Sequence, residues 1–96
     1  MKYKTIPLSQ ANINSEARLI VAISEYKEIT TKKNDKMLVG HIEDLSTTKK
    51  FVIFPNAFSQ LSAPLKKDVL YYVLGKLEKD NKNEESFNIY KIAEVK

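Results

Sequence analysis

Cysteine is absent from this sequence, histidine occurs once, as His41, and glycine occurs only at Gly40 and Gly75. Without cysteine the chain has no disulfide, no thiol nucleophile and almost no means of building a structural zinc site, which fits a reducing compartment such as the cytoplasm. A single histidine leaves any metal site dependent on carboxylates. Two isolated glycines exclude a glycine-rich phosphate loop. We therefore expect no metal ion and no cofactor.

Long apolar segments are also missing. No apolar run approaches the roughly 20 residues of a membrane-spanning helix, and Met1 to Pro7 lacks the apolar region of a secretory signal, so we expect neither membrane insertion nor secretion. The chain has 96 residues, of which 43% are hydrophobic and 29% charged, as in one small globular domain. The net charge of +4 permits a polyanionic partner without requiring one.

Five segments carry the alternation and the β-branched residues that are typical of strands. They are Arg18 to Ile29, Met37 to Asp44, Lys49 to Phe54, Val69 to Glu78 and Phe87 to Val95. Short polar turns join the first three, which predicts a three-stranded meander.

The pattern changes at Pro55, a residue favoured in the first turn of a helix. Phe58, Leu61 and Leu65 follow at helical spacing, and Pro64 ends the segment, so we predict a short helix of about two turns. Three strands, one helix and two further strands is the element order of an OB-fold, a five-stranded Greek-key barrel. The sequence therefore predicts an all-β domain with one short helix.

Three local features refine this prediction. Residues 1–16 have few periodic apolar positions, so we expect an extended lead-in there and the OB-fold domain over 17–96. Asn34-Asp35 suits the tight hairpin between the first two strands, because both residue types tolerate a left-handed backbone. Gly75, inside the fourth strand, indicates a bulge or bend of the kind that barrel closure needs.

Several short motifs occur together at a spacing that matches a known family. They are Thr31 to Met37 (TKKNDKM), Glu43 to Leu45 (EDL), Val52 to Pro55 (VIFP), the lead-in Ile6 to Leu8 (IPL), and Gly75. This set resembles the OB domain near the C-terminal end of bacterial DNA polymerase III α subunits of the DnaE type. The resemblance covers nearly the whole chain, and the spacing across the first three motifs matches without a gap.

Three positions depart from the family pattern. Asn34 stands where the family usually has glycine, Thr47 replaces a turn glycine, and Lys49 replaces an apolar residue at the start of the third strand. The charged Lys49 argues against an inward-pointing side chain at this position. The resemblance implies one domain of a much longer replicative polymerase whose catalytic carboxylates lie in another domain, and it implies contact with single-stranded template DNA.

OB-folds bind single strands in a positively charged groove lined with aromatic rings, between the loop joining strands one and two and the loop joining strands four and five. The first loop and its flanks offer Lys27, Lys32, Lys33 and Lys36, and Tyr26 precedes them. We predict that these lysines contact phosphates and that Tyr26 stacks on a base. The alternative is a plain solvated hairpin tip.

Two further candidates lie on the predicted sheet. His41 occupies the middle of the second strand on its outward face, where it is suited to stack on a base or to hydrogen-bond with one; a solvated imidazole is the alternative. Lys50 is expected to face outward with Val52 and Phe54. Val39 occupies a position where related OB domains often carry an aromatic ring. Phe54, which precedes a proline, is expected to pack in the core against the helix.

Catalysis has little support in the sequence. The carboxylate pair Glu43 and Asp44 ends the second strand, where adjacent residues point to opposite faces and do not readily share a metal ion or a proton. No serine forms a recognisable nucleophile pair with His41. We expect no catalytic residue and no enzymatic activity from this chain alone.

The last loop argues against tight binding. Residues Glu78 to Glu85 include two lysines and four carboxylates, a net charge of −2 that repels phosphates. We therefore expect weak binding of single-stranded DNA, with a Kd on the order of 10⁻⁴ to 10⁻⁶ M.

Two other functions stay open on the sequence. One is a protein-interaction module that docks on other polymerase domains or on accessory replication proteins. The other is an RNA-binding domain resembling the anticodon-binding OB domain of class II aminoacyl-tRNA synthetases. We expect the isolated domain to be a monomer in either case.

Overall fold

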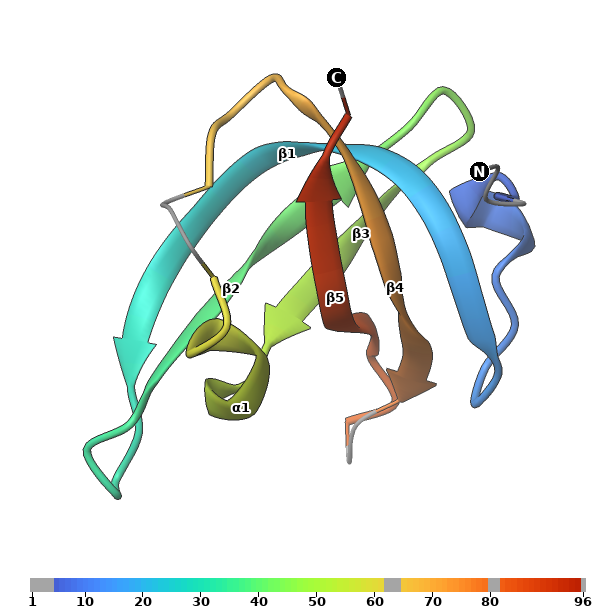
Figure 1. Ribbon diagram of the computed structural model, residues 1–96. Helices are drawn as coiled ribbons and strands as arrows, with labels where there is room; N and C mark the ends of the chain where they lie inside the picture. Colours follow the sequence, from blue (N-terminus) through green and yellow to red (C-terminus); the bar gives the residue numbers. More distant parts are fainter. Residues whose placement is uncertain (1–4, 62–64, 80–81, 96) are drawn as a thin grey trace.

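The five predicted strands are present in the computed structural model, which describes residues 5–61, 65–79 and 82–95 (Figure 1). They are β1 (Glu16–Thr30), β2 (Lys36–Glu43), β3 (Thr48–Ile53), β4 (Leu70–Lys79) and β5 (Glu85–Glu94). A short helix, α1 (Pro55–Phe58), follows β3, and a 3-10 helix, η1 (Leu8–Gln10), precedes β1.

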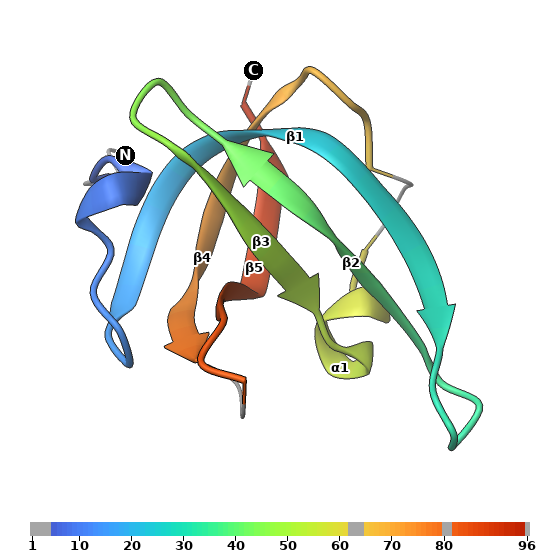
Figure 2. The same cartoon turned by 180° about the vertical axis from the view of Figure 1, so that it is seen from behind.

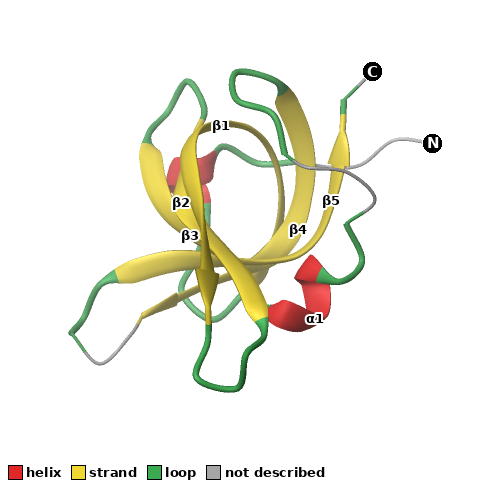
Figure 3. Cartoon of the chain, turned by 90° about the vertical axis from the view of Figure 1, so that its left-hand side faces the viewer, coloured by secondary structure: helices red, strands yellow, loops and turns green. Residues whose placement is uncertain are grey.

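The strands form a closed barrel in the order β1-β2-β3-β5-β4. All neighbours are antiparallel except β3 and β5, which pair in parallel where Lys50 to Val52 meet Ser86 to Asn88. Figure 3 shows the strands curving around a common interior, with α1 beside the ends of β3 and β5. This strand order and the helix between β3 and β4 confirm the predicted OB-fold.

The core forms from the alternate residues of each strand. In β1, Leu19, Val21 and Ile23 are fully buried, and Phe51 of β3 and Phe87 of β5 fill the interior from the facing side. Because successive strand residues point to opposite faces, the residues between these core positions form the outer surface of the barrel.

Register shifts in the β1–β2 and β4–β5 pairs mark two bulges in the sheet. In β1 the pairing with β2 shifts between Ile23 and Glu25, so that Tyr26 lies opposite Gly40. In the β4–β5 pair, Leu74 lies opposite Lys91 and Gly75 lies opposite Ile89, so the extra residue is Tyr90 of β5; the irregularity predicted at Gly75 occurs in the partner strand. A Cβ atom on Gly40 would approach the Tyr26 Cα to 2.6 Å, so a side chain there would force the two strands apart.

The β1–β2 hairpin turns as predicted. Asn34 has a φ of 68°, within the left-handed region that asparagine tolerates. The backbone N–H of Thr31 donates to the Asp35 carbonyl at 2.7 Å and closes the turn. Figures 1 and 2 show this hairpin extending beyond the end of the barrel.

One prediction about local structure is wrong. The helix α1 spans four residues instead of about two turns, because the N–H groups of Gln60 and Leu61 donate to carbonyls three residues back, at 3.1 Å each, and so tighten the chain out of α-helical geometry. Pro64, the predicted stop, lies outside the described residues. Within the predicted lead-in, η1 is flanked by extended backbone at Pro7 and Ala11.

The lead-in packs onto the barrel. Leu8 is fully buried among the core residues, and Ile13 forms a bridge with Leu77 of β4. The Ile6 N–H donates to the Arg18 carbonyl at 3.1 Å. Apolar burial and backbone pairing therefore join residues 6–13 to the same core as the strands.

Candidate nucleic-acid interface

The outer face of β2 and β3 brings together several of the predicted binding residues. One row crosses the sheet from β1 to β5 by direct pairing and consists of Glu25, His41, Lys50 and Ser86. The next row consists of Lys27, Val39, Val52 and Asn88. Figure 2 views the barrel from the side on which β2 and β3 lie in front. Lys27, His41 and Lys50 therefore share one face, which agrees with the outward orientation predicted for His41 and Lys50.

Phe54 extends this face toward α1. It follows β3 with an extended backbone, at φ −72° and ψ 165°, so it continues the outward series of Lys50 and Val52. Its side chain is 45% exposed, so the prediction that Phe54 packs in the core is wrong. The alternation in residues 50–54 already carried this signal, but the following proline favoured a packed position.

Apolar contact area on this face comes from strand residues. Val39 and Val52 are direct partners and are half-buried, and Met37 is the next outward residue of β2 toward the hairpin. We call Met37, Val39, Val52 and Phe54 the outer apolar strip. A flat apolar strip that ends in an exposed aromatic ring offers a surface on which a base can stack.

Ion pairs neutralise part of the positive charge on this face. The His41 Nδ1 lies 2.8 Å from the Glu25 Oε1. The Lys50 Nζ lies 3.6 Å from the Glu84 Oε2. Similarly, the Lys36 Nζ lies 3.2 Å from a carboxylate oxygen of Glu28. These lysines are available to phosphates only in competition with their own carboxylates, which lowers the affinity that they can supply.

The remaining predicted lysines are exposed. Lys32 and Lys33 lie at the hairpin tip, and Lys27 lies on β1 beside the outer apolar strip. Within residues 5–61, 65–79 and 82–95, none of the three forms an ion pair. Among the predicted binding lysines that the structure describes, these three therefore carry a charge that no salt bridge compensates.

Tyr26 lies apart from this face. Because of the register shift after Ile23, Tyr26 pairs with Gly40 and occupies the opposite face of β1 from Lys27. Its half-buried ring packs against the core, and its hydroxyl donates to the Leu65 carbonyl at 2.8 Å. The structure therefore does not bring the predicted stacking residue to the lysines, because the bulge reverses the side on which it projects.

The acidic last loop is directed at β3. The Lys49 Nζ donates to the Glu85 Oε1 at 2.8 Å, and this hydrogen bond, with the positive charge of Lys49, lowers the pKa of Glu85 below its usual value. Lys49 has the same inward parity as Phe51, at the rim of the barrel. Its ammonium group stands where the resembled family has an apolar residue, and the Glu85 carboxylate compensates its charge. Asp80, which also contributes to the negative charge of this loop, lies outside the described residues.

The carboxylates Glu43 and Asp44 do not form a reaction centre. Asp44 accepts hydrogen bonds from the N–H groups of Leu8, Ser46 and Thr47, so its role is to hold a turn. Across residues 5–61, 65–79 and 82–95, no group of three or more histidine or acidic side chains is placed to bind a metal ion. Likewise, none of the helices in the described ranges is long and apolar enough to cross a membrane.

Sequence comparison relates the chain to part of a DNA polymerase subunit. Over 63 residues the chain is 35% identical to the DNA polymerase III subunit alpha of Staphylococcus epidermidis, an alignment that covers 66% of this chain. The chain spans only 6% of the length of that relative. No protein-family profile matches the chain.

Solved structures with the same fold share little sequence with this chain. A domain of replication protein A from Methanococcus maripaludis has a TM-score of 0.79 at 8% identity, with 97% of each chain covered. A mitochondrial single-stranded DNA-binding protein of S. cerevisiae has a TM-score of 0.70 at 19% identity, covering 86% of this chain and 95% of that chain.

An aminoacyl-tRNA synthetase contains the same barrel. The asparaginyl-tRNA synthetase of Pyrococcus horikoshii has a TM-score of 0.71 at 12% identity, covering 99% of this chain and 23% of that chain. At these identities the structural likeness establishes the fold alone, whereas the sequence similarity is to the DNA polymerase III α subunit. The chain is therefore an OB-fold domain whose sequence is related to a segment of the DNA polymerase III α subunit.

Proposed function

We propose that this chain is an auxiliary domain of a bacterial replicative DNA polymerase and that it contacts single-stranded template DNA weakly. The observation that carries the proposal is the outer face of β2 and β3, where Lys27 and Lys50 flank an apolar strip ending in exposed Phe54. Lysines supply phosphate contacts and the ring supplies base stacking. The expected location of such a domain is the cytoplasm.

The expected affinity follows from the same surface. His41, Lys36 and Lys50 are already paired with carboxylates, so only Lys27, Lys32 and Lys33 offer uncompensated charge. A few phosphate contacts place the Kd in the range of non-specific binding, on the order of 10⁻⁴ to 10⁻⁶ M. The domain itself is proposed to have no catalytic activity, and a magnesium-dependent primer extension by the isolated chain would contradict this.

Fluorescence anisotropy with labelled oligo-dT tests the proposal. At low salt the oligonucleotide should bind in the micromolar range and should dissociate progressively as salt rises, because each neutralised phosphate releases counterions. Lys32→Glu combined with Lys33→Glu should weaken binding several-fold without lowering the melting temperature. The matched control is Lys66→Glu combined with Lys67→Glu, which makes the same charge change between α1 and β4. Equal weakening by both double variants, or no salt-sensitive binding at high micromolar protein, would refute the assignment of this face.

An RNA oligomer of the same length distinguishes the RNA-binding alternative. A preference of tenfold or more for RNA, about 1.4 kcal/mol, would favour a function like that of the synthetase domain. Equal or weaker RNA binding supports the polymerase proposal, since no 2′-hydroxyl would then be recognised.

A further inference from the structure

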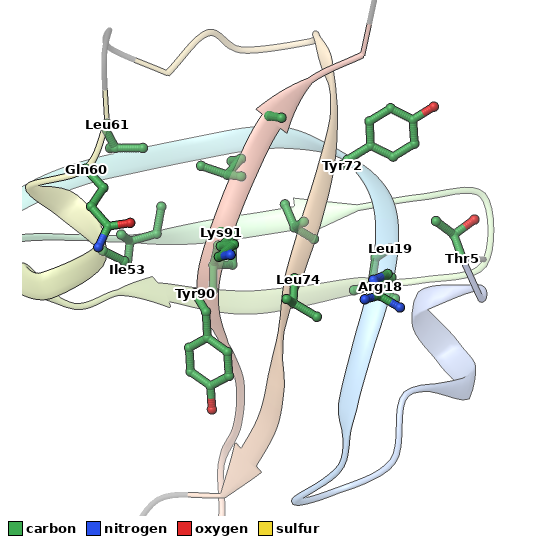
Figure 4. Close-up of a pocket in the computed structure, with 15 residues that line it drawn as sticks. Thr5, Arg18, Leu19, Ile53, Gln60, Leu61, Tyr72, Leu74, Tyr90 and Lys91 are labelled. Atoms are coloured by element: carbon green, nitrogen blue, oxygen red, sulfur yellow. The ribbon is translucent and has the colours of Figure 1, made fainter. Parts of the chain in front are cut away.

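A second surface lies on the opposite side of the barrel. A hollow of about 430 Å³ runs across the outer side of β4 and β5, from α1 to the lead-in. Figure 4 shows Gln60 and Leu61 at one end of this hollow and Thr5 and Arg18 at the other, with β5 and β4 between them. Figure 1 views the barrel from this side, and Figure 2 views it from the side of the proposed nucleic-acid interface. The two surfaces are therefore separate.

Strand pairing explains the shape of the hollow. Arg18, Leu74 and Lys91 form one row across β1, β4 and β5. Beside this row, Tyr72 is paired with Ala93, and the register shift between Leu74 and Gly75 interrupts the pairing near Tyr90. In Figure 4 the rings of Tyr72 and Tyr90 project away from their strands. The bulged residue Tyr90 is therefore itself one of the residues that line the hollow.

The wall of the hollow is apolar at its centre. Leu61 from the end of the α1 segment, Leu74 from β4 and Ala93 from β5 contribute to it. A volume of this size falls within the roughly 300–1,000 Å³ of ligand pockets and accommodates a large apolar side chain. Tyrosine side chains beside such a wall provide both apolar contact and hydrogen bonding, a combination enriched at protein interfaces.

The charged side chains that line the hollow, among the described residues, are all positive. Among the described residues that line it, the charged ones are Arg18 and Lys91, and neither Asp nor Glu contributes to the wall. Neither cation forms an ion pair within the described ranges. Glu94, one strand position beyond Ala93, lies 3.6 Å from Lys66, so its carboxylate already has a partner. An acidic ligand is therefore complementary to this surface.

We propose that this hollow docks an acidic peptide segment of a partner protein, with one large apolar side chain inserted against Leu74 and Ala93 and carboxylates directed at Arg18 and Lys91. A peptide is favoured over a nucleic acid because two cations around an apolar wall suit an anchored side chain, whereas strand binding relies on a run of phosphate contacts. The proposal is independent of the DNA-binding face.

The probe that tests this proposal is a fluorescein-labelled peptide of 12 residues, in which a phenylalanine and a leucine three positions apart are flanked by glutamates. It should bind the wild-type chain with a Kd below about 1 mM, the weak end of specific recognition. Two control peptides separate the contributions. One replaces the glutamates by glutamines, and the other replaces phenylalanine and leucine by alanines; both should bind more weakly than the probe.

Charge reversal on the protein locates the site. Arg18→Glu combined with Lys91→Glu should weaken peptide binding about fivefold or more, the effect of losing exposed charge pairs worth about 1 kcal/mol in total. Lys27→Glu combined with Lys32→Glu makes the same change in net charge on the opposite face and should alter peptide binding less than about twofold. Chemical-shift mapping of the wild-type chain, which needs no variant, should show the largest changes in residues 72–74 and 89–93.

Each contrary result overturns the proposal. If the probe peptide does not bind at about 1 mM protein, or if the glutamine peptide binds equally well, the hollow does not recognise acidic peptides. If both double variants weaken peptide binding equally, the peptide does not bind at the hollow. If oligo-dT displaces the peptide and shifts residues 89–93, this surface binds nucleic acid instead.

Discussion

Asp44 and Leu8, 36 positions apart in the sequence, are joined by a hydrogen bond of 2.7 Å from the Leu8 N–H to the Asp44 Oδ2. The other carboxylate oxygen of Asp44 accepts from the N–H groups of Ser46, at 2.7 Å, and Thr47, at 3.2 Å. One side chain therefore shapes the β2–β3 turn and also fixes the lead-in, whose Leu8 is fully buried in the core.

Replacing Asp44 by alanine should destabilise the domain by about 1–3 kcal/mol, because several N–H donors lose a charged acceptor. Urea denaturation at neutral pH measures this loss, and faster hydrogen exchange at the Leu8 amide should accompany it. Glu43→Ala is the matched control, since Glu43 is exposed, and it should change stability by less than about 0.5 kcal/mol. An equal effect of the two substitutions would contradict the role of Asp44.

The same carboxylate predicts a pH dependence. Partial burial raises the pKa of Asp44, but the hydrogen bonds from Ser46, Leu8 and Thr47 outweigh burial and lower it below 3.8. A folded-state pKa below the unfolded value stabilises the fold above the unfolded pKa, and this stabilisation is lost as pH falls through the folded pKa. The stability difference between wild type and Asp44→Ala should therefore shrink as the pH falls from about 5 to about 2. If the stability difference between wild type and Asp44→Ala stays constant over this pH range, the ionised Asp44 carboxylate does not stabilise the fold.

Lys49→Leu should raise the pKa of Glu85 toward its usual value, because Lys49 supplies both the hydrogen bond and the largest charge interaction that lower it. Carbon-detected NMR titration of the Glu85 carboxylate measures this shift. Stability should change little, since the pair is partly exposed and leucine restores apolar contact at an inward position. Lys50→Leu, whose partner is Glu84, should leave the Glu85 titration nearly unchanged.

Phe54→Ala should weaken oligo-dT binding about fivefold or more, because stacking of a base on an aromatic ring contributes about 1–3 kcal/mol. The melting temperature should change little, since the ring is 45% exposed. Leu70→Ala removes a side chain that is 51% exposed on β4 and serves as the control. Anisotropy titrations of both variants in the same buffer provide the comparison, and unchanged affinity in Phe54→Ala would remove this ring from the interface.

Tyr26→Phe distinguishes the role expected from the sequence from the position found in the structure. Loss of the hydroxyl that donates to the Leu65 carbonyl should cost about 0.5–1.5 kcal/mol of stability. Oligo-dT affinity should stay within about twofold of wild type, because the ring lies on the other face of β1 from Lys27. Tyr26→Leu, which removes the aromatic ring, should also retain oligo-dT binding if the protein remains folded. A large loss of oligo-dT affinity in Tyr26→Leu but not in Tyr26→Phe would show that the ring stacks on a base after all.

Much of the fold could be predicted from local patterns. Alternation placed each of the five strands to within two residues at either end, and Asn34 in the hairpin has the left-handed backbone that its residue type permits. The helix length could not be predicted in this way, because the tightening at Gln60 and Leu61 depends on how the segment packs beneath the barrel rather than on helical spacing.

The sequence by itself determined the order of the elements along the chain and the outward parity of His41 and Lys50, because a period of two assigns faces within a regular strand. Only the tertiary structure decided which residues share a face after a register shift. One irregular position in β1 turned Tyr26 toward the core, and an extended residue after β3 left Phe54 exposed. Long-range contacts also decided that Asp44 holds the lead-in and that Lys49 meets Glu85, since no local pattern specifies a partner 36 residues away.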